Sequence, residues 1–260
     1  MKSVLPFILL IIMLEAGCTA ESGPPAKTES QAESTPPTAQ SIIDHAIEVH
    51  GGSAFDNSHV TFDFRGVHFD VWRKNGMFRN TRTYADTSGL IVEIMTNDGF
   101  ERTADGAPYE MDEREYLKYT EDVNSVVYFA LLPYKLNDPS VKRVLRGTKT
   151  IGGQSYHEIE VSFEQEGGGR DWDDQFVYWF NTETGTMDYL AYYYTQQGTA
   201  RFRKAQNIRT VGGIRFADYL NFRADTMGSD VARAAAAFDA GELDLLSEIL
   251  TENVRVSPAE

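Results

Sequence analysis

The spacing of strand-like segments and glycine turns constrains the fold of this chain more than any other feature. Between residues 60 and 222, short segments of alternating apolar and polar residues are separated by turn signals such as Asn75-Gly76 and Gly212-Gly213. An Asn-Gly pair between two such segments is a strong signal for an antiparallel hairpin. No phosphate-binding glycine motif and no regular alternation of strands with helices is visible. Turn signals about every 8–12 residues therefore predict a mainly β (α+β) fold with roughly ten antiparallel strands.

Two stretches have helical rather than strand-like spacing. Residues 41–50 begin with Ser41, which resembles a helix N-cap, and they stop at Gly51-Gly52. Residues 111–132 lack Gly and Pro, carry apolar residues at helical spacing and are followed by Pro133. The second half of this longer stretch is apolar on nearly every side, so we expect that helix to be buried against a sheet face.

The C-terminal residues also have helical composition. Residues 230–240 are rich in Ala and are followed by Gly241, and residues 243–250 form a further short apolar stretch. We therefore predict a helical extension over residues 226–260 that follows a β domain over residues 41–225.

The N-terminal residues predict export and a lipid anchor. Lys2 precedes an apolar run over residues 4–14, and small residues stand before Cys18, which is typical of a signal peptide over residues 1–17. Cys18 is the only cysteine of the chain and cannot form an internal disulfide. The segment resembles a bacterial lipoprotein signal with its lipobox, although Glu15 stands where Leu is usual, and the resemblance implies lipidation of Cys18. The alternatives are an ordinary cleaved signal or a short membrane anchor, for which about eleven apolar residues are few.

Residues 18–40 predict a disordered tether. After Cys18 this stretch holds small and polar residues with no large apolar side chain, so it cannot bury enough surface to offset its chain entropy. With a lipid on Cys18, the tether would hold the folded domain away from a membrane surface.

The charge balance argues against nucleic acid as a partner. The formal net charge is −15 at pH 7, whereas binding to a phosphate backbone requires a basic surface. The same balance argues against a polybasic dock on anionic lipid headgroups. We interpret the charge as a source of solubility.

Local sequence resembles a family of uncharacterised lipoproteins from Bacteroidota. The likeness covers residues 42–222 and implies an envelope location, but it implies no catalytic residue and no cofactor. A more distant resemblance links the chain to the LolA- and LppX-type lipoprotein-carrier superfamily. That resemblance implies an incomplete barrel, or half-barrel, over residues 41–225 with helices covering its concave face. The stretches that match the Bacteroidota family are residues 46–52, 62–66, 97–102, 124–134, 137–139 and 163–169.

Candidate catalytic and metal-binding residues are few. His45 and His50 are five positions apart, whereas a helical metal pair is usually separated by roughly three or four. His157 begins a predicted strand and has no adjacent nucleophile motif. We therefore assign no catalytic residue and no metal site.

The loop after Gly167 offers one further possibility. Asp171, Asp173 and Asp174 could supply oxygen ligands to Ca²⁺, although no further ligands stand at fixed spacing. Trp172 could stack on a sugar. A solvated acidic loop is the simpler interpretation.

Aromatic residues on two central strands are the best candidates for binding. Phe176, Tyr178 and Phe180 share one strand face while Trp179 lies on the other, so both faces are apolar, as in a sheet that is covered on one side and lines a cavity on the other. A filled core without a cavity is the alternative, and residues 128–134 would form part of a lid. The candidate ligand-binding residues are Trp72, Tyr128, Phe129, Tyr134, Tyr178, Trp179 and Tyr192.

These features favour a membrane-anchored lipoprotein of the bacterial cell envelope. We expect it to be attached through Cys18, at the outer membrane facing the periplasm or the surface, and to bind a lipid or another apolar small molecule without a cofactor. The alternative is a non-enzymatic assembly or polysaccharide-interaction module with a filled core. A hydrolase is a third possibility, which no nucleophile elbow or metal triad supports.

Overall fold

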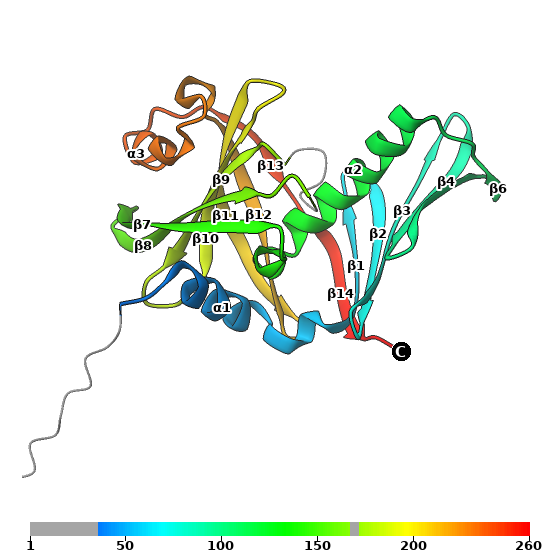
Figure 1. Cartoon of the computed structure of the whole chain (residues 1–260), viewed down its shortest axis with the longest axis horizontal. Helices are drawn as coiled ribbons and strands as arrows, with labels where there is room; N and C mark the ends of the chain where they lie inside the picture. Colours follow the sequence, from blue (N-terminus) through cyan, green and yellow to red (C-terminus); the bar gives the residue numbers. More distant parts are fainter. Residues whose placement is uncertain (1–35, 167–171) are drawn as a thin grey trace, which may run out of the picture. The chain divides into compact units, whose positions relative to one another are not determined.

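The described part of the computed structural model, residues 36–166 and 172–260, contains two antiparallel sheets of seven strands each (Figure 1). Sheet A has the strand order β14-β1-β2-β3-β4-β5-β6, and sheet B has the order β13-β12-β11-β10-β9-β8-β7. Neither order closes into a ring, so the predicted mainly β fold with an incomplete barrel is confirmed. The predicted signal peptide, Cys18 and most of the predicted tether lie outside the described residues.

Sheet A is a meander of hairpins whose turns the sequence identifies. Asn75 and Gly76 both have positive φ, 51° and 79°, as a two-residue type I′ turn requires. The turn joins Lys74 to Met77 in register. The strands are β1 (Asn57–Phe64), β2 (Val67–Lys74), β3 (Met77–Asp86), β4 (Gly89–Thr96), β5 (Gly99–Ala104), β6 (Ala107–Pro108) and β14 (Glu252–Pro258).

Sheet B contains the most aromatic strands. We call the face that bears Tyr178 and Tyr192 the inner face, and the face that bears Trp179 and Ala191 the outer face, because successive strand residues point to opposite sides. The strands are β7 (Val141–Ile151), β8 (Gln154–Phe163), β9 (Gln175–Asn181), β10 (Met187–Tyr194), β11 (Thr199–Val211), β12 (Ile214–Arg223) and β13 (Leu245–Ile249).

The prediction of a helical C-terminal extension is wrong beyond residue 240. Residues 231–239 do form a 3-10 turn and the short helix α3 (Ala234–Asp239), but β13 then pairs with β12 and β14 pairs with β1. The apolar run over residues 243–250 is too short for periodicity to distinguish a helix from a strand, and open sheet edges can take up a further strand. One C-terminal segment therefore borders both sheets, and residues 37–260 form one compact unit without a separate extension.

Helix α1 (Ala39–His50) begins two residues before the predicted start, within the predicted tether. Thr38 rather than Ser41 is its N-cap. The Thr38 side chain accepts a hydrogen bond from the Ser41 backbone N–H, and the Ser41 side chain accepts one from the Thr38 backbone N–H. Its apolar residues Ile42 and Ile43 are buried against the inner face of sheet B. The helix thus covers part of the face that the barrel interpretation assigns to the interior.

Helix α2 (Glu113–Ala130) agrees closely with its prediction, and Asp112 caps it through a capping box with Glu115. Its first half packs on β3 and β4. Val127 joins the core of sheet A, whereas Tyr128 and Phe129 pack against the core of sheet B. The sequence predicts a buried second half, but Tyr128 and Phe129 are only half-buried because their rings border two hollows beside the helix. Among the described residues no helix is long and apolar enough to cross a membrane.

Both faces of sheet B are covered. The inner face packs against α1 and the short 3-10 turn Tyr134–Asn137. On the outer face, Trp179 and Phe202 pack beneath α3 with Ala234 and Ala235. The apolar character of both faces of β9 and β10, which is visible in the sequence, is therefore explained by two separate cores.

Candidate ligand-binding site

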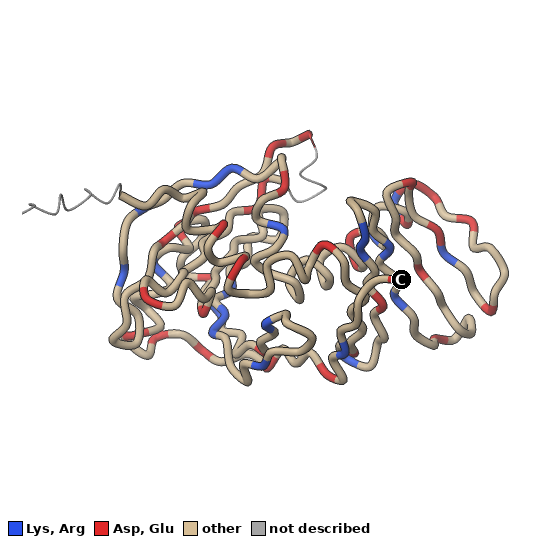
Figure 2. Tube along the Cα trace, turned by 90° about the horizontal axis from the view of Figure 1, so that it is seen from below, with Lys and Arg blue, Asp and Glu red and all other residues tan. Residues whose placement is uncertain are grey.

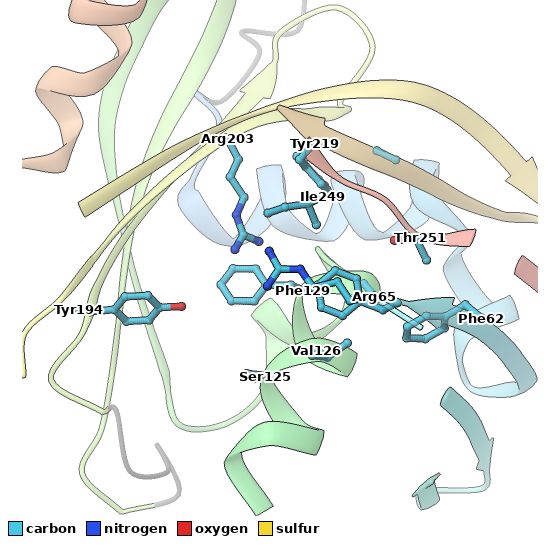
Figure 3. Close-up of a pocket in the computed structure, with 13 residues that line it drawn as sticks. Phe62, Arg65, Ser125, Val126, Phe129, Tyr194, Arg203, Tyr219, Ile249 and Thr251 are labelled. Carbon is cyan, nitrogen blue, oxygen red and sulfur yellow. The ribbon is translucent and has the colours of Figure 1, made fainter. Parts of the chain in front are cut away.

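Two hollows lie beside the second half of α2. The first, which we call the arginine hollow, has a volume of about 240 Å³ and lies where α2 meets β1 and the strands β10–β13 (Figure 3). Its walls come from far-apart parts of the chain, including the segment Ile249 to Thr251 that joins β13 to β14. Its main lining residues are Phe62, Arg65, Val126, Phe129, Arg203 and Tyr219.

The second, the tyrosine hollow, has a volume of about 290 Å³. It shares Ser125, Phe129 and Tyr194 with the arginine hollow. The two spaces therefore adjoin each other beside Phe129. Its main lining residues are Met95, Tyr128, Lys135, Phe163, Phe176 and Tyr194.

Phe129, which lines both hollows, is held by aromatic neighbours on the inner face of sheet B. Its ring centroid lies 5.4 Å from that of Tyr192 and 6.5 Å from that of Phe176. The neighbouring ring of Tyr128 stands almost perpendicular to it at 5.6 Å. Aromatic contacts of this kind stabilise by about 0.5–1.5 kcal/mol each beyond their buried area.

Tyr128 and Tyr178 form a hydroxyl pair beneath the tyrosine hollow. Their oxygens are 3.2 Å apart, and burial raises the pKa of both phenols. Burial also raises the pKa of Tyr194, and that of Tyr219 to about 12. All four hydroxyls are therefore neutral at physiological pH and can donate or accept a hydrogen bond.

Arg203 on β11 brings a positive charge to the arginine hollow. It is 9% exposed, and its Nη2 donates to the Tyr192 hydroxyl at 2.7 Å. Its guanidinium carbon lies 4.3 Å from the centroid of the Phe129 ring and 4.9 Å from that of Tyr192. Arg65, at the β1–β2 turn, also points its guanidinium into the hollow (Figure 3). The site thus combines apolar walls, neutral hydroxyls and cations.

The structure brings together four of the seven predicted ligand-binding residues. Tyr128 and Phe129 border the hollows, and Tyr178 and Tyr192 form the wall behind them. These four come from α2 and from the inner face of two adjacent strands.

The other three predicted residues lie elsewhere. Trp179 is buried on the outer face, where it donates to Glu158 at 3.0 Å, because it alternates with Tyr178 along the strand. Tyr134 stacks on Phe55, and Trp72 lies in a separate surface depression with His59.

Sequence reasoning missed both arginines of the arginine hollow. Arg203 pairs with Leu190 on the inner face, and its neighbours along the strand, the buried Phe202 and the half-buried Lys204, lie on the outer face. The signal was a cation at an inward-facing strand position, close to the inward-facing Tyr192 on the neighbouring strand. Arg65 gave no such signal, since an arginine in a hairpin turn is ordinarily solvated.

His50 and Asp174 make hydrogen bonds that hold local structure in place. The Nδ1 of His50 donates to the Ala46 carbonyl, and its Nε2 accepts from Arg215 at 3.0 Å. Burial lowers the pKa of His157. Asp171 lies outside the described residues, and Asp174 accepts from the backbone of Thr195. No group of three His, Cys, Asp or Glu side chains suited to a metal ion occurs within residues 36–166 and 172–260.

Comparison with known proteins gives a family but no activity. A family model described as a family of unknown function (DUF6503) matches residues 30–252. No curated protein matches the chain.

Several solved structures are similar in backbone at low identity. They include a LolA superfamily protein from Nitrosomonas europaea, at a TM-score of 0.48 and 12% identity over 86% of this chain and 94% of that chain. A DUF1329 family protein from Desulfovibrio piger has a TM-score of 0.42 at 12% identity over 85% and 93%. The lipoprotein LppX from Mycobacterium tuberculosis has a TM-score of 0.27 at 12% identity over 59% and 86%. The expected carrier proteins are thus among the structural neighbours, at similarities too low to transfer a ligand.

Proposed function

This chain belongs to the DUF6503 family of unknown function, and we propose that it binds a lipid or another hydrophobic ligand beside α2. The proposed ligand would lie between the second half of α2 and the inner face of sheet B. The role would be binding and sequestration rather than catalysis.

The observation that carries this proposal is the pair of adjoining aromatic hollows that share Phe129 as a lining residue. Ligand pockets usually have volumes of about 300–1,000 Å³. The separate volumes of about 240 and 290 Å³ lie just below that range. A rotation of the Phe129 side chain would join the two spaces and bring them within it, which provides room for an alkyl chain.

Helix α2 can act as the movable wall of this site. Only Val123 and Val127 are fully buried on it, although it has 18 residues. Segments with few buried apolar contacts open at lower free energy than core elements. The lid that we expected over residues 128–134 would then extend to the second half of α2.

We further propose that the domain is held at a membrane of the bacterial cell envelope, as in the Bacteroidota lipoproteins that its sequence resembles. The support is the lipobox-like sequence before Cys18 and the tether over residues 18–40. Metabolic labelling with a radioactive fatty acid should label the full chain and not the variant Cys18→Ser. An unlabelled wild-type chain would refute the anchor without affecting the binding proposal.

Native mass spectrometry with lipid extraction tests the binding proposal. The protein would be expressed from Thr19 onward, without the signal and Cys18, and purified without detergent. We expect a co-purifying lipid, or saturable uptake of a fluorescent fatty acid. Phe129→Glu should lose this binding because it places a carboxylate between the hollows. Tyr116→Glu is the matched control, since Tyr116 lies on the same helix but is 39% exposed.

An apo mass with no uptake of fatty acid by the wild type would contradict the proposal. Binding that survives in Phe129→Glu would place the ligand elsewhere. Calcium-dependent glycan binding that is lost in Trp172→Ala would instead favour the interaction module. A hydrolase would require an activity that His157→Ala abolishes.

A further inference from the structure

Within residues 36–166 and 172–260, Arg203 is a buried cation without an ion-pair partner, which distinguishes it from the ion-paired arginines of this protein. Arg82 and Arg102 pair with Glu93, and Arg215 pairs with Asp188 at 3.0 Å. Arg203 has a single hydrogen bond, to the Tyr192 hydroxyl, and its Nε has no partner among the described residues. Arg73 is also buried, but it lies near Asp56 and Asp138 and lines neither hollow.

An unpaired buried guanidinium is unfavourable. Arginine does not lose its proton in proteins, and a buried charge normally requires a partner of opposite sign and full hydrogen bonding. The rings of Phe129 and Tyr192 offset part of this cost through cation–π contacts. The unbonded Nε of Arg203 still lacks an acceptor.

The lining of the arginine hollow, as far as the structure describes it, carries no charged side chains other than Arg65 and Arg203. Its described lining residues include no Asp or Glu, although the chain as a whole has a net charge of −15. Acidic residues are spread along the described trace with Lys and Arg interspersed (Figure 2). Arg65 adds a second cation, and the structure shows no ion pair for it within the described part of the chain. The hollow is therefore locally positive in an acidic protein.

The remaining lining fits the apolar part of a ligand. Phe62, Val126 and Ile249 provide apolar walls, and Ser125 and Tyr194 provide neutral hydroxyls. An oxyanion could accept hydrogen bonds from the guanidinium groups, which match carboxylate and phosphate geometry. An alkyl chain attached to it could pass Phe129 into the tyrosine hollow.

We propose that the arginine hollow binds the acidic headgroup of an anionic amphiphile, a carboxylate or phosphate ester on an alkyl chain, through Arg203 with Arg65 at the rim. This inference rests on the proposed function and specifies the chemical class of its ligand. Arg203 acts as the counterion of the headgroup, and the aromatic wall binds the chain.

Calorimetric titration with a matched pair of probes tests the inference. Dodecanoate and dodecanol have the same chain and differ in charge, and each would be used below its aggregation or solubility limit at pH 7.5. Wild-type protein should prefer dodecanoate. Arg203→Met, which keeps an unbranched side chain, should weaken dodecanoate binding by about tenfold or more and leave dodecanol binding unchanged.

Two variants serve as controls. Lys204→Met removes the same charge from the same strand on the outer face, where Lys204 lies over Phe238, so it should change neither affinity. Arg203→Lys keeps the positive charge but lacks the planar guanidinium group, so it should retain part of the preference for dodecanoate over dodecanol. Circular dichroism of each variant identifies loss of the fold.

Equal affinity of the wild type for both probes, unchanged by Arg203→Met, would overturn the headgroup site and leave the proposed function standing. No binding of either probe would overturn both. Displacement of dodecanoate by inorganic phosphate at similar concentration would show a site for free anions and would also overturn the inference.

Discussion

His50 should make this protein lose stability in mild acid. The ring is 1% exposed at the C-terminal end of α1, and both of its nitrogens are hydrogen-bonded in the neutral form. Burial, followed by the charge of Arg215, lowers its pKa from 6.5 to about 4. Protonation of His50 in the folded state would place an imidazolium beside the Arg215 guanidinium. It would also remove the Nε2 lone pair that accepts the hydrogen bond from Arg215.

The size of this stability loss follows from the difference between the pKa of His50 in the folded state and in the unfolded state. Because the folded-state pKa lies below the unfolded value, the contribution of His50 is complete above pH 6.5 and is lost as the pH falls toward 4. A shift of this size lowers the free energy of unfolding by about 2.5 kcal/mol between pH 7.5 and pH 4.5. Many carboxylates also titrate in this window, so the contribution must be isolated by comparison.

Urea unfolding of wild type and His50→Gln at the two pH values makes that comparison. Glutamine keeps a donor and an acceptor but does not titrate, so the variant should lose about 2.5 kcal/mol less than the wild type. His45→Gln is the control, because His45 is exposed on the same helix. Parallel losses in wild type and His50→Gln would refute the assignment of a neutral, hydrogen-bonded His50.

Two substitutions test other parts of the fold. Glu93→Gln should lower the free energy of unfolding by about 3–5 kcal/mol in urea titrations, because it leaves Arg82 and Arg102 without their buried carboxylate; a loss below about 1 kcal/mol would mean that the cluster is solvated. Gly212→Ala should lower the melting temperature more than Gly76→Ala does, although both glycines have positive φ. A Cβ at Gly212 would lie 2.5 Å from the Cβ of Val256, whereas a Cβ at Gly76 would meet nothing within 4 Å. Equal melting temperatures for these two variants would contradict the close approach of β14.

Local signals in the sequence were sufficient for most of the fold. The Asn75-Gly76 turn, the alternation along β9 and the cap at Asp112 each depend on residues within a few positions of one another. The strand β13 could not be predicted in this way. Its conformation depends on the free edge of β12, which precedes it by more than twenty residues, and a short apolar run does not identify its own partner.

The candidate site was only partly predictable for a related reason. Aromatic positions on β9 and β10 indicated a binding face, and the structure places Tyr178 and Tyr192 there. Successive residues of a strand point to opposite faces of the sheet, so Trp179 lies on the outer face although Tyr178, its neighbour in the sequence, lies on the inner face. The sequence alone does not say which of the two faces borders a cavity. The role of Arg65 depends on the long-range approach of a turn in sheet A to strands of sheet B, which no local pattern encodes.

Arginines packed against different parts of α2 differ in whether the chain supplies them with a carboxylate. At sheet A, the chain supplies Glu93 to Arg82 and Arg102, and Asp122 of α2 adds a second carboxylate 3.4 Å from Arg82. The ion pair with Asp122 holds the middle of α2 to sheet A. At the second half of α2, Arg203 has aromatic rings and a hydroxyl but no carboxylate within the described residues. Under the proposal above, the acidic headgroup of the ligand supplies the negative charge that the described part of the chain does not place beside Arg203.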